Sequence, residues 1–126
     1  MADLGPESVA TRFLHHDEQL RAALRHRDFM PHRSETSVAD ITGLCAGEVW
    51  AMGANTLRPG SGRTQVRGRA DLTVGDVMKL GLTAIRDDVP FVRHSVITGW
   101  PDGEDADARC KELAKELAAA ARLVRR

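Results

Sequence analysis

Residues 73–98 read TVGDVMKLGLTAIRDDVPFVRHSVIT, and this stretch carries the clearest signals of secondary structure in the chain. Thr73 is a favourable N-cap for a short helix over 74–80, with Asp76 at the third helical position. The residues of this helix expected to face the core are Val74, Val77 and Met78. Gly81 follows at the position where helices commonly end in a left-handed residue. The stretch therefore predicts a short capped helix with a sharp stop.

Four short segments rich in β-branched and apolar residues are predicted as strands. Two of them follow the short helix directly, over 82–86 and 92–98. The other two lie upstream, over 36–42 (TSVADIT) and over 66–72. Turn-forming residues separate the four segments, so each is expected to be a separate strand of one sheet.

Three longer segments carry apolar residues at helical spacing, three and four positions apart. They cover 15–27, 46–57 and 106–124. The last is the clearest, because acids at its start and arginines at its end both suit the helix dipole. Its apolar stripe is formed by Ala106, Cys110, Leu113, Ala114, Leu117, Ala121 and Val124. A long amphipathic helix is therefore predicted at the C-terminal end.

The order of these elements predicts an α+β fold, a small mixed or antiparallel sheet covered by helices. The length of 126 residues fits a single domain over 1–126. Residues 1–13 are expected to form a loose N-terminal segment, because Gly5-Pro6 breaks regular structure. Residues 58–68 (RPGSGRTQVRG) are expected to form a flexible basic loop.

Composition excludes several classes of protein. Eighteen Lys and Arg balance eighteen Asp and Glu, which argues against a strongly basic protein that coats nucleic acid. The sequence has no long apolar run and no signal-peptide pattern, so a cytoplasmic location without membrane contact is expected. Two cysteines, Cys45 and Cys110, are too few for a disulfide scaffold or a four-cysteine zinc site.

Four segments together carry a resemblance to other proteins. They are RDFMP at 27–31, TSV at 36–38, GRAD at 68–71 and PFVRHSVITGWP at 90–101. In outline, residues 27–121 resemble a widespread set of short bacterial proteins of unknown activity, which share an Arg-His strand ending in Gly-Trp-Pro. Those proteins often carry Phe-Arg where this chain has Ala39-Asp40. The resemblance implies a bacterial gene, in a mobile-element or defence-related setting, and brings no activity with it.

Arginines and histidines recur in the segments around the predicted sheet. Clustered arginines bind phosphate or carboxylate through paired hydrogen bonds, and a histidine among arginines is held neutral and can act as a base. The candidate anion ligands are Arg27, Arg33, Arg69 and Arg93, and the candidate bases are His94 and His32. The alternative is that these are surface arginines balanced by Asp28, Glu35 and Asp71.

The basic loop offers a second candidate surface. Arg58, Arg63 and Arg67 lie in or beside glycine-rich backbone that could approach nucleic acid or a partner, although the spacing of a P-loop is absent. A solvated loop without a ligand is the alternative. Trp100, between Gly99 and Pro101, is either a stacking platform for a base or partner or a lid over the core.

No metal, cofactor or covalent nucleophile is predicted. His15 and His16 are adjacent and point about 100° apart on a helix, which does not suit a shared ion. Cys110 belongs to the apolar stripe of the last helix, and no histidine motif accompanies Cys45.

Two functions remain open from the sequence, and they leave open whether the chain is an enzyme. The favoured hypothesis is a small non-catalytic interaction module or accessory subunit that binds a protein partner or a second copy of itself, with nucleic acid as a further contact. The alternative is a small enzyme acting on a phosphate-bearing substrate, a nucleotide or nucleic acid. Convergence of Arg69, Arg93 and His94 in one pocket would favour the enzyme.

Overall fold

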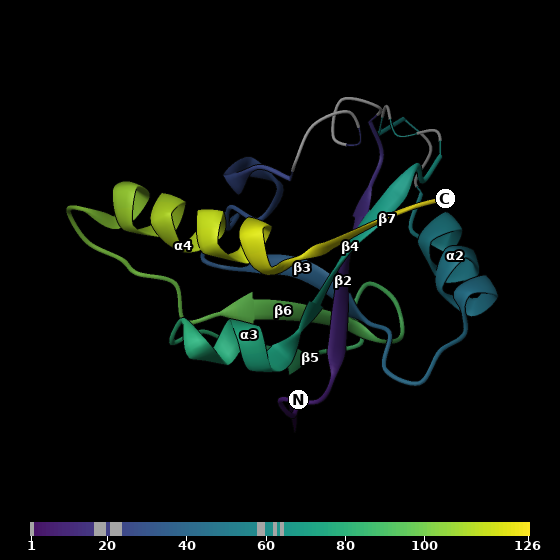
Figure 1. The fold of residues 1–126 in the computed structure, drawn as a ribbon, viewed down its shortest axis with the longest axis horizontal. Coiled ribbons are helices and arrows are strands. Elements are labelled where there is room, and N and C mark those ends of the chain that lie inside the picture. Colours follow the sequence, from purple (N-terminus) through teal and green to yellow (C-terminus); the bar gives the residue numbers. More distant parts are fainter. Residues whose placement is uncertain (1, 17–19, 21–23, 58–59, 62, 64) are drawn as a thin grey trace.

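The computed structural model describes residues 2–16, 20, 24–57, 60–61, 63 and 65–126. In this part of the chain seven strands form one antiparallel sheet in the order β1-β5-β6-β3-β2-β4-β7 (Figure 1). The strands are β1 (Ala2–Asp3), β2 (Val9–Leu14), β3 (Thr36–Asp40), β4 (Gly68–Thr73), β5 (Thr83–Arg86), β6 (His94–Thr98) and β7 (Arg122–Arg125). The predicted α+β class is confirmed, and the sheet is antiparallel throughout.

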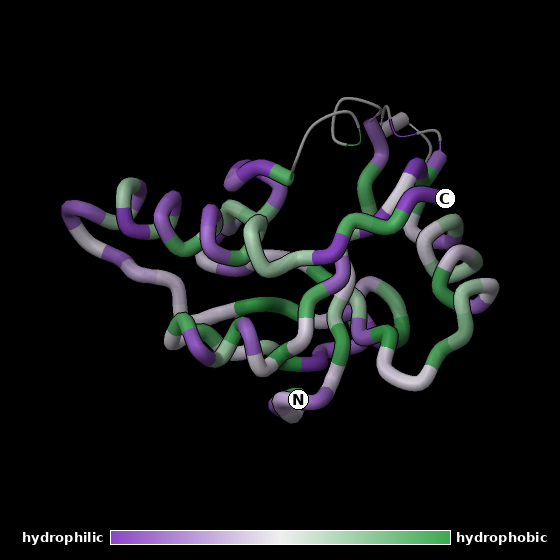
Figure 2. The backbone as a smooth tube through the Cα atoms, in the orientation of Figure 1, coloured by the Kyte–Doolittle hydropathy of each residue, from purple (hydrophilic) through white to green (hydrophobic). Residues whose placement is uncertain are grey.

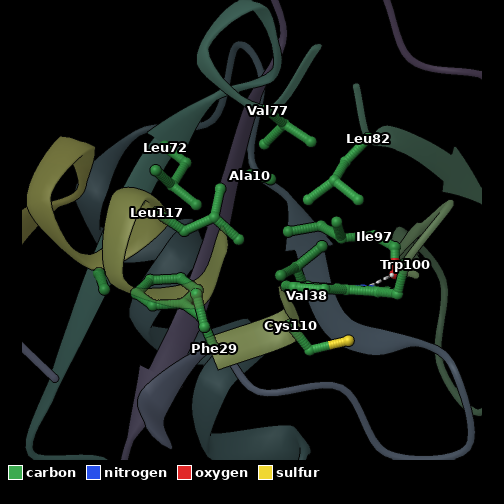
Figure 3. Packing of buried hydrophobic residues seen from close by; sticks show 12 residues of the cluster. Ala10, Phe29, Val38, Leu72, Val77, Leu82, Ile97, Trp100, Cys110 and Leu117 are labelled. Atoms are coloured by element: carbon green, nitrogen blue, oxygen red, sulfur yellow. Dashed lines mark hydrogen bonds between the residues drawn. The ribbon is translucent and has the colours of Figure 1, made fainter. Parts of the chain in front are cut away.

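One face of the sheet carries the main core. The helix α4 (Ala106–Ala120), the helix α3 (Val74–Lys79) and the 3-10 turn η1 (His26–Asp28) lie on this side. Buried side chains from the strands meet Phe29, Cys110 and Leu117 from the covering segments (Figure 3). Along α4, hydrophobic residues alternate with hydrophilic ones, as an amphipathic helix lying on a sheet requires (Figure 2).

The opposite face of the sheet carries a second, smaller buried cluster. The helix α2 (Ala46–Asn55) packs there, and its Val49 joins Ala39 and Ile41 in a smaller buried cluster. Gly53 is the point of closest approach, because a Cβ at that position would lie 2.7 Å from the ring of Phe13.

The stretch 73–98 folds largely as predicted. The Thr73 hydroxyl accepts a hydrogen bond from Asp76 N at 3.3 Å and caps α3. Gly81, at φ +80°, ends the helix: its N–H donates to Met78 O, and the next N–H, of Leu82, donates to Val77 O. This is the Schellman arrangement that satisfies the last carbonyls of a helix. Met78 is the exception, since it is 46% exposed rather than in the core.

The expectation of a loose segment over 1–13 is wrong. Residues 9–14 form β2, which lies inside the sheet between β3 and β4. Gly5-Pro6 breaks the chain only locally, and the strand that follows is held by neighbours on both sides. Of the predicted helix over 15–27, residues 17–19 and 21–23 lie outside the described residues; residues 15–16 and 24–25 are not helical, and residues 26–27 belong to the 3-10 turn His26–Asp28.

The C-terminal helix is shorter than predicted. It ends at Ala120, because Ala121 adopts an extended backbone with ψ 146°. Residues 122–125 then pair with β4 as the edge strand β7. Val124 and the terminal arginines therefore belong to the sheet and not to the helical stripe. Among the described residues no helix is both long and apolar enough to cross a membrane.

Candidate functional site

A cleft opens where β2 and β3 part. The two strands pair only at Ala10–Asp40 and Thr11–Ala39; beyond these pairs β2 follows β4 while β3 follows β6. The cleft that results has a volume of about 490 Å³. It is lined by Thr11, Arg12, Phe13, His15, His16, Arg25, Arg27, Asp28, Ser37, Val38, Ala39, Thr56, Arg63, Pro90, Phe91 and His94. Its size is in the range of small-molecule sites.

Arg12 bridges the gap between the parting strands. Its Nε donates to Asp28 O at 2.9 Å, and its Nη1 donates to Ser37 O at 2.8 Å. Burial lowers the pKa of the Arg12 guanidinium, the positive charge of Arg63 lowers it further, and the charge of Asp28 acts in the opposite direction. Both hydrogen-bond acceptors are neutral carbonyls, so these bonds orient the guanidinium without cancelling its charge.

Three further arginines reach the cleft from the chain around it. They are Arg25, Arg27 and Arg63, all on exposed positions. Among the described lining residues, Asp28 is the one acid, and its Oδ2 accepts a hydrogen bond from Arg25 N at 2.8 Å. A cleft with four guanidinium groups and one carboxylate attracts anions, above all phosphate, which accepts paired bonds from arginine.

His94 lies in the wall of the cleft in a fixed orientation. Its Nδ1 is 2.6 Å from Asp87 Oδ1, and its ring packs edge-to-face on Phe91 with the centroids 5.2 Å apart. An ionised carboxylate only accepts hydrogen bonds, so Nδ1 carries the hydrogen of this bond. Backbone hydrogen bonds also fix the loop between β5 and β6, because Asp87 N donates to His94 O and His94 N donates to Phe91 O.

Two more histidines follow directly after β2. Burial is the main cause that lowers the pKa of His15, and the charge of Arg63 lowers it further. A hydrogen bond to the backbone of Gln65 acts in the opposite direction, and the charges of His16 and Arg12 add smaller lowering effects. Burial therefore favours the neutral imidazole of His15.

Of the residues predicted as a site, the structure brings Arg27, Arg63 and His94 to this cleft. Arg93 is elsewhere: its Nη2 donates to Thr42 O at 2.8 Å, and its Nη1 lies 3.7 Å from Asp40 Oδ2. The prediction of Arg93 as an anion ligand is thereby corrected. Its charge is already matched by a buried carboxylate within the fold.

Arg69 also stays outside the cleft. Its Nε forms an ion pair with Asp71 at 3.1 Å, and its guanidinium stacks 4.7 Å from the ring centre of Trp50. Arg126, next to β7, lies over the same ring at 5.8 Å. Arg69 therefore joins α2 to the sheet, which corrects its prediction as an anion ligand.

His32 and Arg33 lie on an exposed turn closed by His32 N, which donates to Glu35 O at 2.7 Å. This turn does not line the cleft, so neither residue joins the predicted cluster. Arg67 directly precedes β4, and its backbone N–H donates to Leu14 O at 2.8 Å. Arg58 lies outside the described residues, as do parts of the predicted basic loop over 58–68.

Trp100 is a core residue. It is 8% exposed, and its indole N–H donates to Ile97 O at 3.0 Å (Figure 3). Its burial corrects the expectation that it contacts nucleic acid or a partner. The alternative of a lid over the core describes the position of this side chain.

Sequence reasoning missed Arg12, and it considered His15 and His16 only as a possible metal-binding pair, which it rejected. The signal that could have found them is the pattern VATRFLHH over 9–16, in which β-branched and aromatic residues indicate a strand that leads into the two histidines. The described residues contain no group of three or more His, Cys, Asp and Glu side chains placed to hold a metal ion. Burial raises the pKa of the Cys110 thiol, which packs in the core, while Cys45 is exposed.

No family model matches the sequence, and neither a curated protein nor a solved structure matches it. The resemblance to short bacterial proteins therefore stays a prediction, and the cleft itself is the basis on which a function can be proposed.

Proposed function

We propose that the cleft between β2 and β3 binds a phosphate-bearing ligand, either a nucleotide or a phosphodiester segment of nucleic acid. The observation that carries the proposal is the partly buried guanidinium of Arg12, held at 2.9 Å and 2.8 Å by two neutral carbonyl oxygens. Desolvating a cation is costly, and a bound anion would compensate that cost. The exposed arginines at the rim add attraction that extends into solvent.

Arg69 and Arg93 lie outside the cleft that holds His94, so the convergence that would have favoured an enzyme is not met, and the proposal rests on a different set of cleft residues. The chain as a whole is neutral, with 18 basic and 18 acidic residues, yet Arg and His side chains collect in this one cleft with a single acid among its described lining residues. The aromatic rings of Phe13 and Phe91 also line the cleft, and such rings can stack on a nucleobase.

Calorimetric titration with a nucleoside monophosphate at low salt tests the proposal. Arg27→Gln removes an exposed cation at the cleft, and Arg33→Gln removes an exposed cation outside it. We expect Arg27→Gln to weaken binding by about tenfold, the contribution of one charged hydrogen bond, and Arg33→Gln to leave it unchanged. Equal weakening by the two variants, or no binding by the parent protein, would refute a site in this cleft.

A protein-docking role keeps one specific observation in its favour. Val89 and Val92 are 69% and 70% exposed, on either side of the Pro90 and Phe91 that line the cleft. Exposed apolar side chains next to a cleft are typical of interaction surfaces. Replacing both valines by serine would reduce self-association or partner binding if this role holds, and it would leave nucleotide binding unchanged.

A further inference from the structure

The last strand of the sheet, β7, has a neighbouring strand on one side only. It continues from the end of α4 and runs along β4 (Figure 1). In the described part of the chain it is one of two edge strands, and the other edge strand, β1, has only two residues. An edge strand presents backbone N–H and C=O groups with which another extended segment can pair. β7 is therefore the longer of the two edges at which a strand can be added.

The strand register shows which backbone groups of β7 face away from β4. Arg126 N donates to Arg67 O at 3.1 Å, directly beyond the last pair of the two strands, so this residue bonds toward β4. In an antiparallel pair, residues that bond across the pair alternate with residues whose backbone groups point outward. Within β7 the N–H and C=O groups of Leu123 and Arg125 therefore point away from β4, and those of the other two residues point toward it.

A groove lies beside this edge, on the face of the sheet that α4 covers. Leu123 lies opposite Ala70, a residue of the main core, so its side chain is on that face. The groove has a volume of about 630 Å³, and most of its lining consists of alanine and leucine side chains. It is lined by Leu24, Arg25, His26, Lys115, Ala118, Ala119, Ala121 and Leu123, so the described lining residues include basic side chains and no acid.

We propose that β7 binds an extended acidic segment of a partner protein, which joins the sheet as a further antiparallel strand and places apolar side chains in the groove. Partner residues opposite Leu123 and Arg125 exchange backbone hydrogen bonds with them, and their side chains lie on the groove side. In strand addition of this kind, main-chain bonds give affinity and pockets for alternate side chains give specificity. The inference does not depend on the ligand proposed for the cleft between β2 and β3, although Arg25 lines both the cleft and the groove.

The charge around β7 is the reason for an acidic occupant. Three of the five residues over 122–126 are arginines, and all three are exposed. The groove adds Arg25 and Lys115, of which Lys115 has an exposed partner in Glu112 at 3.4 Å. Opposite charges that face each other across paired strands stabilise the pair, and like charges destabilise it. The same rule disfavours a second copy of this chain, because that copy would bring three more arginines to the same edge.

The outward backbone groups favour a peptide over nucleic acid as the acidic occupant. The carbonyl oxygens of Leu123 and Arg125 are acceptors, so a partner must supply donors as well as acceptors. A phosphodiester backbone offers acceptors to the arginines but no donors at the spacing of a strand. An extended peptide presents an N–H and a C=O toward its neighbour at every second residue, which matches the spacing along β7.

Fluorescence anisotropy with short labelled peptides tests the proposal on the full chain. The probe is a peptide of alternating glutamate and valine, because valine favours strands and glutamate supplies the charge. We expect saturable binding of this peptide, and binding weaker by about tenfold or more for a peptide of alternating lysine and valine. Equal binding of the two peptides, or no binding of the glutamate peptide, would overturn the inference and leave the function proposed for the cleft standing.

Methylation of the probe's backbone tests the hydrogen bonds themselves. In the antiparallel arrangement the valines that enter the groove lie opposite Leu123 and Arg125, so their N–H groups bond to β7 while the glutamate N–H groups face solvent. N-methylation of the valines should therefore abolish binding, and N-methylation of the glutamates should change it little. Equal binding of the two methylated peptides, or stronger binding of the valine-methylated one, would overturn strand addition at this edge.

Variants of the protein locate the binding surface. Arg125→Glu reverses an exposed charge on β7, and Arg33→Glu makes the same change on an exposed turn outside the groove. We expect Arg125→Glu to weaken binding of the glutamate peptide by about fivefold and Arg33→Glu to leave it unchanged. Leu123→Pro removes an outward N–H and no bond to β4, so it should abolish peptide binding while circular dichroism shows the fold retained. Equal weakening by the two arginine variants, or unchanged binding by Leu123→Pro, would overturn the assignment.

Two other occupants of this edge would give different results. A second copy of the chain would appear in sedimentation as a dimer that Leu123→Pro dissociates. Nucleic acid would appear as a DNA oligonucleotide that displaces the glutamate peptide and whose binding Arg125→Glu weakens while Leu123→Pro does not. Either result would overturn an acidic peptide as the occupant of β7.

Discussion

Two groups of arginines on the same sheet differ in what surrounds their charge. Arg86 and Arg93 lie at the end of β5 and the start of β6, where Asp40 Oδ2 is 3.7 Å from both guanidinium groups. Asp88 Oδ1 accepts from Arg86 Nε at 2.8 Å and from Arg93 N at 2.7 Å. Arg12, on β2, is held by carbonyl oxygens instead. The charges of Arg86 and Arg93 are matched by acids, whereas the hydrogen-bond acceptors of Arg12 are neutral, and our proposal assigns the charge of Arg12 to a ligand.

This difference explains why residue type alone misassigned the site. Arg93 and Arg69 look like anion ligands in the sequence, but each is matched within the fold, Arg93 by Asp40 and Arg69 by Asp71. Asp40 is distant from Arg93 in the sequence, whereas Asp71 is two positions from Arg69, so sequence separation does not reveal which acid matches which arginine. The strand register decides which acid lies beside which arginine. An arginine available to a ligand is one that the fold has left without a paired acid.

Asp40→Asn should have the largest effect on stability. Asp40 Oδ1 accepts from Thr42 N and Thr42 Oγ1. Loss of the Asp40 charge removes the carboxylate that lies beside the Arg93 guanidinium and leaves Arg86 with Asp88 alone. We expect the free energy of unfolding to fall by about 3 kcal/mol. Denaturant unfolding measures this, and nucleotide affinity of the folded protein should not change. A large loss of affinity would mean that the matched arginines also serve the ligand.

Arg12→Met should have a smaller effect on stability and a larger one on binding. The apolar side chain keeps much of the packing but leaves the carbonyls of Asp28 and Ser37 without their donors, at a cost of about 2 kcal/mol. Nucleotide binding should be lost, as titration of the folded variant would show. If binding survives with only the stability lowered, Arg12 is a structural arginine like Arg93, and the contrast between the two groups fails.

The pH dependence of His15 should give the smallest effect. Its pKa is lowered in the folded protein from 6.5, mainly by burial. The unfolded chain therefore binds more protons below about pH 6.5, so His15 stabilises the fold above that pH and this contribution is lost as pH falls toward the folded pKa. The slope of unfolding free energy against pH should flatten in His15→Gln. An identical slope in both proteins would exclude this linkage.

Local signals predicted the parts of the fold that local chemistry decides. The cap at Thr73, the left-handed Gly81 and the strands on either side of 87–93 depend on neighbours within a few residues. Residues 122–125 were wrongly predicted as helix. Leucine and arginine favour helix locally, but pairing with β4 makes this segment a strand. β2 was missed for a related reason, since its place between β3 and β4 comes from distant partners.

The site was predicted in part. His94 and Arg27 were identified as candidates from residue type, and both line the cleft. The Asp87 partner of His94 could not be identified, because it requires knowing how the chain turns between β5 and β6. Arg12 was missed because its strand, β2, was not predicted from the sequence. Sequence patterns thus identified some of the residues that line the cleft but not the full set that the fold brings together.

Imidazole resonances offer the most direct test of the proposed site, since the chain has five histidines. His15, His16 and His94 line the cleft, whereas His26 and His32 do not. Titration of isotope-labelled protein with a ribonucleoside 3′-monophosphate, followed by long-range nitrogen–proton correlation spectra, reports each ring separately. We expect saturable shifts for His15 and His94 with His32 unchanged. Shifts confined to His32, or none at ligand excess, would contradict a phosphate site between β2 and β3.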